Sequence, residues 1–406
     1  MSQTEVQLIK NGAVVDADIN GMSSSKLSGA LPAISGASLT NLPIPIGKTR
    51  NLIINGAMQV AQRGSASSTT NGLATVDRFK KIGAGLGNTF SQEQITLSSS
   101  DTPYSSGFRK AFRVSQNQAG TANAAGAIDF SHYIEAQNLT DSGWNYTSAS
   151  SEITLQFWFR VSTNQTFYGV LYTPDGTVQT YPFSFTASGN NTWTKITHTF
   201  PGNSNITINN DNGTGLILYL IPFYGTDYTD NSKSVNAWSA HSTNFCPDMA
   251  STWLTAGAST FDVTGIQLEV GSVATDFEHK SFGEELALCQ RYYYRYQQDG
   301  SSSAYWVGHV SAYGSLNNMI VFYLPVSMRS YPSSMETSGT NSDYQLWGNN
   351  TVESLGSGST PTLRGSQGLN HQAVAVDISH NIGTGESRIL RIGGSTSAYF
   401  GFSAEL

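Results

Sequence analysis

The sequence predicts an all-β protein: a jelly-roll β-sandwich and a second, smaller β-rich C-terminal domain, joined by a short helix and preceded by an extended N-terminal arm. Three observations support this fold class. Most apolar segments alternate apolar with polar residues, which is the period of a strand with one buried face. Clusters of Gly, Ser, Thr and Asn separate these segments and indicate turns. One stretch alone, residues 281–298, has the period of a helix.

The chain divides into four expected regions. Its 406 residues are enough for two or three domains with cores of their own. We expect an N-terminal arm over residues 1–48, the sandwich over 49–280, the linking helix over 281–298 and the C-terminal domain over 299–406. No repeat of 20 to 50 residues is present, which argues against a propeller or a long β-helix.

Residues 1–48 contain no aromatic residue. Their apolar residues are widely spaced, and Pro32, Pro43 and Pro45 exclude a long helix. Such a segment cannot bury its own leucines, so it is either a disordered arm or one that wraps with copies of itself or with a partner. We favour a stalk of three chains and therefore expect a homotrimer.

Residues 49–280 contain the strands of the expected sandwich. The strands predicted from alternation are Leu52–Met58, Thr89–Leu97, Phe108–Ser115, Ile128–Glu135, Ile153–Val161, Thr166–Thr173, Thr180–Thr186, Thr192–Phe200, Leu216–Phe223 and Phe261–Val270. Such a series of antiparallel strands without an internal helix is typical of a jelly roll. Residues 225–258 alternate little, and we expect a long surface loop there, a kind of segment that often carries function.

The stretch from Phe261 to Gln298 joins the two β-regions. Gly265 interrupts the alternation of its strand and indicates a β-bulge. Ser281 precedes Glu284 by three residues, which is the pattern of a capping box. The spacing that follows predicts a helix over 281–298, and its apolar face would consist of Phe282, Leu286, Cys289 and Tyr293.

Residues 299–406 contain a second set of strands. The predicted ones are Tyr305–Val310, Asn318–Leu324, Tyr344–Trp347, Ala373–Ile378, Arg388–Ile392 and Ala398–Ala404. Because Gln297–Ser303 is a polar connection with Gly and Ser, a domain boundary is expected there. We therefore expect a separable C-terminal tip domain.

Composition excludes several classes of protein. The net charge of −7 argues against binding to nucleic acid, which requires a basic patch. No window approaches 18 consecutive apolar residues, so we expect no membrane insertion, and no secretory signal is visible. Two cysteines cannot form a disulfide framework, and Cys289 on the apolar helix face is expected to be a buried thiol.

The sequence contains no familiar catalytic or metal-binding motif. HExxH, CxxC, GxSxG and the phosphate-binding loop are all absent, and the seven histidines are scattered. Glu284 and Glu285 are neighbours on the predicted helix and point about 100° apart, so they suit its N-terminus better than an acid–base pair. We expect no catalysis, no metal and no cofactor.

Aromatic residues in loops indicate a site for glycans. Flat rings can pack on the C–H faces of sugars, with amides and carboxylates nearby to bind the hydroxyls. A single Trp is more often a core residue, but loop-like segments favour exposure. The candidates are Trp144, Tyr146, Tyr224, Asp227, Trp238 and Trp253. Trp158 lies in a strand and faces away from its neighbours Phe157 and Phe159.

Several segments resemble a family of phage proteins. Val263–Gly271, Asp276–Lys280 and Leu286–Tyr293 are similar to a segment that recurs in phage tail-fibre and receptor-binding proteins. Asn51–Gly56 resembles the opening strand of the carbohydrate-binding-like jelly roll in that family. Leu324–Arg329 with Pro332, and the final Ser403–Leu406, resemble parts of its tip domain. The resemblance covers roughly residues 50–406.

The resemblance implies a fibre protein on the exterior of a virion, on the tail or the capsid. Residues 1–48 would then anchor the homotrimer to other virion proteins, and the β-domains would bind host-surface glycans. Two alternatives remain open. One is a head fibre, or a capsid decoration or neck protein. The other is a glycan-degrading depolymerase, for which paired carboxylates about 5–10 Å apart would be the mark.

Overall fold

The structure of the protein is a computed structural model, and it describes residues 50–297, 304–314, 318–338, 340–348, 351–356, 359–365, 371–380, 382–383, 385–393 and 398–406. The chain divides into Met1–Pro43 and Ile44–Leu406, and every described residue belongs to the second unit. The arm predicted over residues 1–48, the stalk it would form and most of the connection after Gln297 lie outside the described residues.

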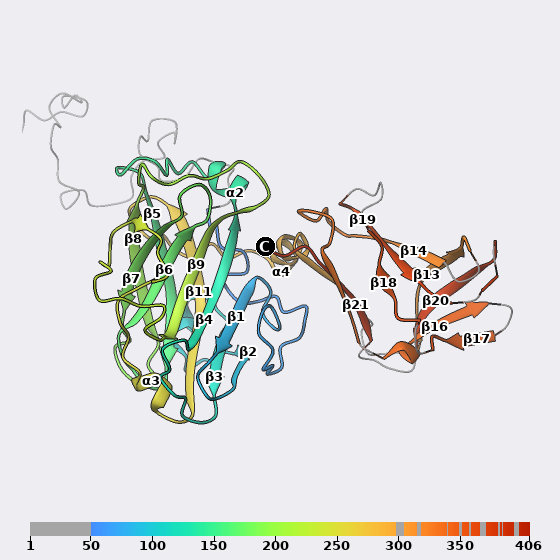
Figure 1. Ribbon diagram of the computed structural model, residues 1–406, viewed down its shortest axis with the longest axis horizontal. Helices are drawn as coiled ribbons and strands as arrows, with labels where there is room; N and C mark the ends of the chain where they lie inside the picture. Colours follow the sequence, from blue (N-terminus) through green and yellow to red (C-terminus); the bar gives the residue numbers. More distant parts are fainter. Residues whose placement is uncertain are drawn as a thin grey trace, which may run out of the picture. The chain divides into compact units, whose positions relative to one another are not determined.

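Two antiparallel sheets form a jelly-roll-like sandwich, as the sequence predicts (Figure 1). One sheet has the order β1 (Phe79–Ala84), β4 (Ala127–Glu135), β9 (Thr214–Tyr224), β6 (Phe167–Thr173), β7 (Gln179–Phe185) and β10 (Ser239–Ala240). The other has the order β2 (Phe90–Thr96), β3 (Lys110–Gln116), β11 (Ser259–Val270), β5 (Glu152–Val161) and β8 (Thr194–Pro201). Buried rings such as Phe130, Phe157 and Phe261 fill the core between them.

Connections within the sandwich contain short helices, which the sequence did not predict. They are α1 (Thr102–Ser105), α2 (Ala136–Thr140) and α3 (Thr252–Thr255). Each is too short to show a helical period in the sequence. Because α3 and β10 both lie within residues 225–258, that segment is not the free surface loop that was expected.

The segment Asn51–Gly56 is a turn rather than the expected opening strand. The side chain of Asn51 accepts from Leu268 N at 3.0 Å and donates to Ile266 O at 3.1 Å. Asn55 has a φ of +62°, and its side chain bonds the backbone of Val60. Such side-chain bonds compete with strand pairing, so the prediction of a strand over Leu52–Met58 is wrong.

Strand β11 carries the predicted bulge. Its register with β5 shifts between Thr264 and Gln267, and Gly265 has a φ of +63°. A side chain at this position would be strained by the backbone and would meet the ring of Phe108. Thr264 and Gln267 therefore both face outward, opposite Trp158 and Gln156.

Helix α4 (Phe282–Gln290) begins with the predicted capping box of Ser281 and Glu284. It ends much earlier than predicted, because Tyr293–Gln297 forms strand β12, paired with β21 (Tyr399–Ser403). Consecutive tyrosines favour strands, and the partner strand at the end of the chain lies too far along the sequence to be recognised. The predicted helix over 281–298 is thus corrected to a helix followed by a strand.

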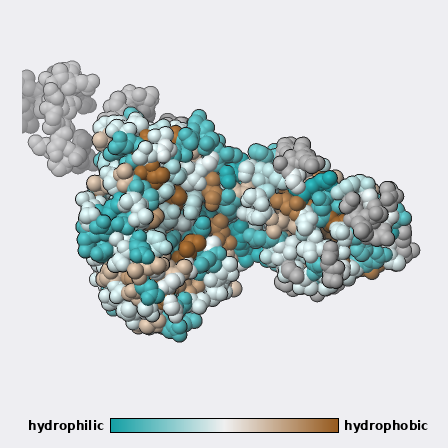
Figure 2. Space-filling view, in the orientation of Figure 1, coloured by the Kyte–Doolittle hydropathy of each residue, from teal (hydrophilic) through white to brown (hydrophobic). Residues whose placement is uncertain are grey.

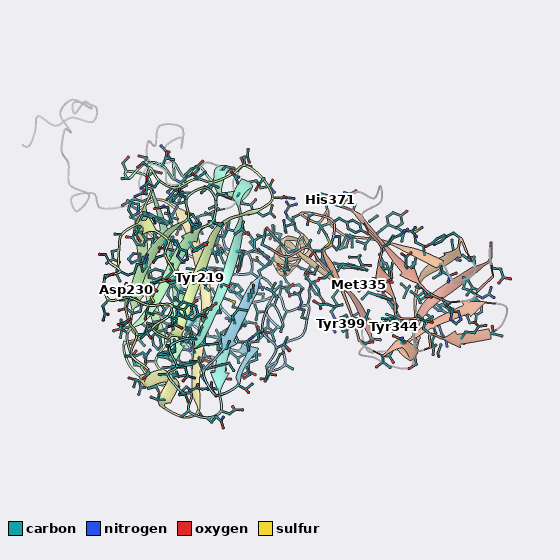
Figure 3. The ribbon with its side chains drawn as sticks, viewed as in Figure 1. Tyr219, Asp230, Met335, Tyr344, His371 and Tyr399 are labelled. Carbon is teal, nitrogen blue, oxygen red and sulfur yellow. The ribbon has the colours of Figure 1, made fainter. Side chains whose placement is uncertain are left out.

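The C-terminal part contains two sheets, and its core includes Phe322, Phe400 and Leu390. The smaller sheet has the order β12, β21, β15 (Ser334–Thr337). The larger has the order β17 (Thr351–Ser354), β16 (Tyr344–Gly348), β20 (Ser387–Gly393), β13 (Ala304–Ala312), β14 (Asn318–Tyr323), β19 (Ala373–Ile378) and β18 (Thr362–Leu363). Tyr344 connects the two, because its hydroxyl donates to Tyr399 O at 2.6 Å; both residues are labelled in Figure 3.

Buried ion pairs and stacked guanidinium groups fasten the sandwich to β12 and the chain end. Arg78 and Arg63 lie over the rings of Tyr292 and Tyr293, at 3.5 and 3.4 Å from the ring centroids, and both pair with Glu405. On the sandwich, the buried Glu135 accepts two hydrogen bonds from Arg291, at 2.8 and 2.9 Å. Tyr292 and Tyr293 are therefore buried residues that pack against these arginines.

The surface is mostly polar on the side shown in Figure 2, and both cysteines are free thiols. Apolar residues appear in Figure 2 as small separate patches between polar ones on the side shown. Cys246 and Cys289 are buried and free, as expected for thiols without a disulfide framework. Within the described ranges, no helix is long and apolar enough to cross a membrane.

Candidate functional site

Three of the predicted glycan-binding residues lie in the core. Trp253 is completely buried, and its indole N–H donates to Thr260 O at 3.0 Å. Trp144 is buried too and donates to Ser151 O, while the hydroxyl of the buried Tyr224 donates to Asp129 Oδ2 at 2.9 Å. These rings have no free face for a sugar, so their assignment to a glycan site is corrected. Rings from connections, short helices and strand ends of a sandwich can therefore be buried by their neighbours, as Trp144, Trp253 in α3 and Tyr224 at the end of β9 are.

The other three candidates are not fully buried. Trp238 is half-buried against Tyr181 and donates to Pro201 O at 2.7 Å. Tyr146 packs on the edge of Trp144. Asp227 is exposed, and its backbone N–H bonds Ala124 O. Tyr146 and Trp238 both bond to the segment over residues 201–203, since Tyr146 O accepts from Asn203 N at 2.7 Å. The assignment of these three residues to a glycan site stays a prediction.

The most exposed pair of indole rings lies in the C-terminal part. Trp306 in β13 is 51% exposed and Trp347 in β16 is 37% exposed. Their ring centroids are 5.5 Å apart and the rings are inclined by 74°. Two large aromatic side chains that expose so much surface, side by side, are uncommon on a protein that does not use them for contact.

The strand register explains why these rings meet. Strand β20 lies between β13 and β16, so that Trp306 and Gln345 both face Arg391, and Trp347 faces Ile389. Residues that face each other in antiparallel strands point to the same side of the sheet. The neighbours Tyr305 and Val307 pack against the core on the other side, and the register shift after Trp306 marks a bulge.

Polar groups accompany the two rings. Arg391 Nε donates to Gln345 Oε1 at 2.8 Å, and the guanidinium carbon lies 5.8 Å from the ring centroid of Trp306. No carboxylate among the described residues pairs with Arg391. We call Trp306, Trp347, Arg391 and Gln345 the tryptophan platform. It combines flat rings with hydrogen-bonding groups, which is the chemistry that sugar rings require.

The sequence did not single out the platform. Tyr305, Trp306 and Val307 are all apolar, so alternation does not show which of them faces outward. Trp347 ends a predicted strand, a position that is more often part of a core. Arg391 and Gln345 are polar residues in predicted strands, and this was the only hint in the sequence that this side of the sheet faces solvent. The strand pairing that brings them beside Trp306 and Trp347 is not visible in the sequence.

A second concentration of rings covers the outer face of the six-stranded sheet. Tyr133, Tyr168, Tyr172 and Tyr219 point to this side, and Tyr219 is labelled in Figure 3. Phe245, from the segment over residues 225–258, packs on Tyr172 and Tyr219 at centroid distances of 6.1 and 5.7 Å. Since this segment already occupies the rings, the face is a poorer ligand platform than Trp306 and Trp347.

Asp129 on the same face is a carboxyl group whose pKa is raised into the range that suits a general acid or base. Burial raises its pKa to about 7, against the opposing effect of the hydrogen bond from Tyr224. A glycosidase would need a second carboxylate across a groove from it. Asp129 is instead enclosed below Tyr224, and the part of the chain described here holds no cluster of three metal-ligating side chains.

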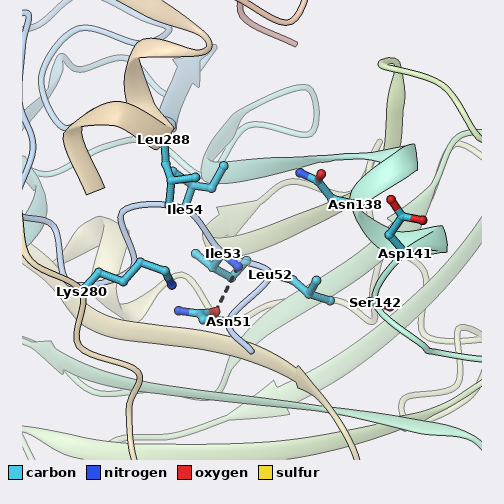
Figure 4. A pocket seen from close by; sticks show the side chains of 9 residues that line it. All are labelled: Asn51, Leu52, Ile53, Ile54, Asn138, Asp141, Ser142, Lys280 and Leu288. Carbon is cyan, nitrogen blue, oxygen red and sulfur yellow. Dashed lines mark hydrogen bonds between the residues drawn. The ribbon is translucent and has the colours of Figure 1, made fainter. Parts of the chain in front are cut away.

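A pocket of about 490 Å³ lies between the turn over 51–54, helix α2 and helix α4 (Figure 4). Its lining is mixed: four aliphatic residues lie beside five polar or charged ones, which are Asn51, Asn138, Asp141, Ser142 and Lys280. One dashed line in Figure 4 is the bond from Ile53 N to Asn51 Oδ1, 3.0 Å long. No aromatic side chain lines it, so it lacks the flat surface on which a sugar ring would stack.

Comparison with known proteins gives weak likenesses. No protein-family model and no curated protein sequence matches this chain. Among solved structures, it is similar to the enzymatically active domain of tailspike protein 4 of bacteriophage CBA120, at 9% identity and a TM-score of 0.29, over 54% of this chain and 21% of that one.

Carbohydrate-binding modules are also among the similar structures. The family 11 module of a cellulosomal cellulase of Clostridium thermocellum is 10% identical, with a TM-score of 0.26 over 52% of this chain and 98% of the module. A family 61 module in complex with β-1,4-galactotriose is 10% identical, with a TM-score of 0.26 over 55% and 100%. At these values the likenesses carry no conclusion about the function of this chain.

Proposed function

We propose that this chain is a non-catalytic fibre protein on the exterior of a phage virion, and that it binds host-surface glycans through the tryptophan platform. The observation that carries the glycan-binding part is the pair of exposed rings, Trp306 and Trp347, 5.5 Å apart in strands that the same neighbour holds in register. Rings held by paired strands lose little entropy on binding, which favours their use as anchors.

The virion part rests on the resemblance of segments such as Val263–Gly271 and Leu286–Tyr293 to phage tail-fibre proteins. In a homotrimer anchored through residues 1–48, each particle would present many platforms. Binding of one platform can then be weak, because attachment at several points multiplies the affinity. Weak binding by a single platform is also what we expect of an open surface site, which buries less of a ligand than a deep cavity does.

The test is binding of the full-length chain to an array of bacterial surface polysaccharides. We expect the double variant Trp306→Ala/Trp347→Ala to lose about 10- to 100-fold in affinity, since each aromatic contact contributes about 0.5–1.5 kcal/mol. Phe282→Ala is the matched control, because this ring is 57% exposed but lies on helix α4. Binding that falls equally in both variants, or is absent in the unchanged chain, would contradict the proposal.

The same array tests the absence of catalysis. Polysaccharides that bind should release no new reducing ends during prolonged incubation with the chain. Release that requires Asp129 would instead favour a depolymerase.

A further inference from the structure

We propose that the sandwich carries a second saccharide site, which takes a single neutral sugar residue and is independent of the tryptophan platform. The site is a pocket of about 270 Å³ on the outer side of the five-stranded sheet. The side chains that carry its chemistry are Gln156, Trp158, Lys195, Asp276, Phe277 and His279. We call it the sandwich pocket.

The fold builds this pocket from the bulge and the segment after β11. Gly265 lines it without a side chain, and a Cβ there would lie 2.6 Å from Phe108 Cζ. Phe277 packs edge-on against Phe108, with centroids 4.8 Å apart. His279 Nε2 lies 2.9 Å from Ser106 O. The bulge thus leaves room where a regular strand would place a side chain.

Hydrogen bonds fasten the segment that passes over the sheet. Gln156 Nε2 donates to Thr275 O at 2.6 Å, and Glu278 N donates to Gln267 Oε1 at 2.8 Å. The pocket therefore exists before any ligand binds, which is usual for small-molecule sites. A preformed pocket also spares a ligand the cost of ordering the segment.

One buried acceptor points to the kind of ligand. Gln156 is only 1% exposed, and its Oε1 has no hydrogen-bond partner within the described part of the chain. An unsatisfied buried carbonyl oxygen costs free energy, and a donor that reaches it recovers that cost. The neighbouring groups are the half-buried rings of Trp158 and Phe277, which suit a ligand with both hydroxyls and a C–H face.

Size and charge narrow the class to one neutral sugar. The volume lies just below the range of about 300–1,000 Å³ that holds drug-sized ligands. Lys195 and Asp276 give the exposed lining one charge of each sign, so it favours neither an acidic nor a basic ligand. A hexose residue, at the end of a chain or as a side branch, meets both conditions.

The experiment uses the full-length chain with Trp306→Ala/Trp347→Ala, so that the platform cannot contribute. The probes are methyl glycosides of glucose, galactose, mannose and N-acetylglucosamine, titrated by saturation-transfer NMR. We expect at least one to bind with a Kd on the order of millimolar, as suits a ligand of this size. Adding Trp158→Ala should raise that Kd about tenfold or abolish binding.

Two further variants complete the test. Lys195→Ala changes an exposed group and should weaken binding without affecting the melting temperature. Tyr168→Ala is the matched control, because this ring is also half-buried but lies on the outer face of the other sheet. The proposal is overturned if no glycoside binds, or if Trp158→Ala and Lys195→Ala leave the Kd unchanged. Since the platform is already removed, failure of the proposed adhesion function would leave this result unaffected.

Discussion

Substitution of Trp253 by Ala should cost the sandwich about 3–5 kcal/mol of its free energy of unfolding. The ring is completely buried, so the substitution loses nearly all of the buried area of about 150–250 Å² that an aromatic side chain typically contributes. Buried apolar area stabilises the fold by about 25 cal/mol per Å², which gives a cost of this size. The substitution also removes the hydrogen bond to Thr260 O and the parallel contact with Phe90, whose ring centroid is 6.3 Å away.

Calorimetry of the full-length chain measures this cost. At about 2–4 °C per kcal/mol for a domain of this size, the melting temperature of the sandwich should fall by about 6–20 °C. Trp347→Ala, which removes a ring already 37% exposed, should shift melting by less than about 4 °C. If Trp253→Ala melted within about 3 °C of the unchanged chain and glycan binding fell instead, the separation of core rings from platform rings would be refuted.

Three further predictions concern charge and assembly. The pKa of Asp129 is about 7 in the folded chain against 3.8 ordinarily, so between these values the folded state holds a proton that the unfolded state releases. The free energy of unfolding therefore falls as pH rises from about 4 to 7. Denaturant titrations of Asp129→Asn should show up to about 4 kcal/mol less of this fall. Arg291→Met removes both hydrogen bonds from Arg291 to the buried Glu135 and leaves its charge without the guanidinium partner, which should cost about 3–5 kcal/mol of the free energy of unfolding. Glu135→Gln should restore part of this cost in the double variant, and an unchanged denaturation midpoint would disprove the role of this pair. Deletion of residues 1–48 should convert a trimer to smaller species in light scattering, and a full-length chain that is already monomeric would exclude the trimer.

Strands with one buried face were predictable because burial imposes a period of two. Strand β2 (Phe90–Thr96) lies within the predicted Thr89–Leu97, and its buried Phe90 and Gln92 alternate with the partly exposed Ser91 and Glu93. Strand β1 (Phe79–Ala84) was missed because Lys81 faces inward. Its Nζ donates to Phe90 O at 2.8 Å, and burial lowers its pKa to about 8. A buried lysine that is satisfied by backbone carbonyls looks polar in the sequence, and so it hides the alternation.

The candidate site was harder to predict because exposure of a ring depends on tertiary contacts. Trp253 lies in the short helix α3, within a segment that shows little alternation, and is nevertheless buried, whereas Trp306 lies in a strand and is exposed. The end of the predicted helix over 281–298 was misplaced for a related reason. Strand β12 pairs with β21, about 100 residues later, and Glu405 accepts from Arg78, contacts that no local pattern reveals.

Fluorine NMR of the full-length chain, labelled with 5-fluorotryptophan, tests the central claim most directly. The chain has seven tryptophans, so each resonance can be assigned with one Trp→Phe variant. On addition of a surface polysaccharide that binds, we expect the signals of Trp306 and Trp347 to shift while those of the buried Trp144 and Trp253 stay in place. Shifts confined to other tryptophans, with Trp306 and Trp347 unmoved at saturating polysaccharide, would contradict the account.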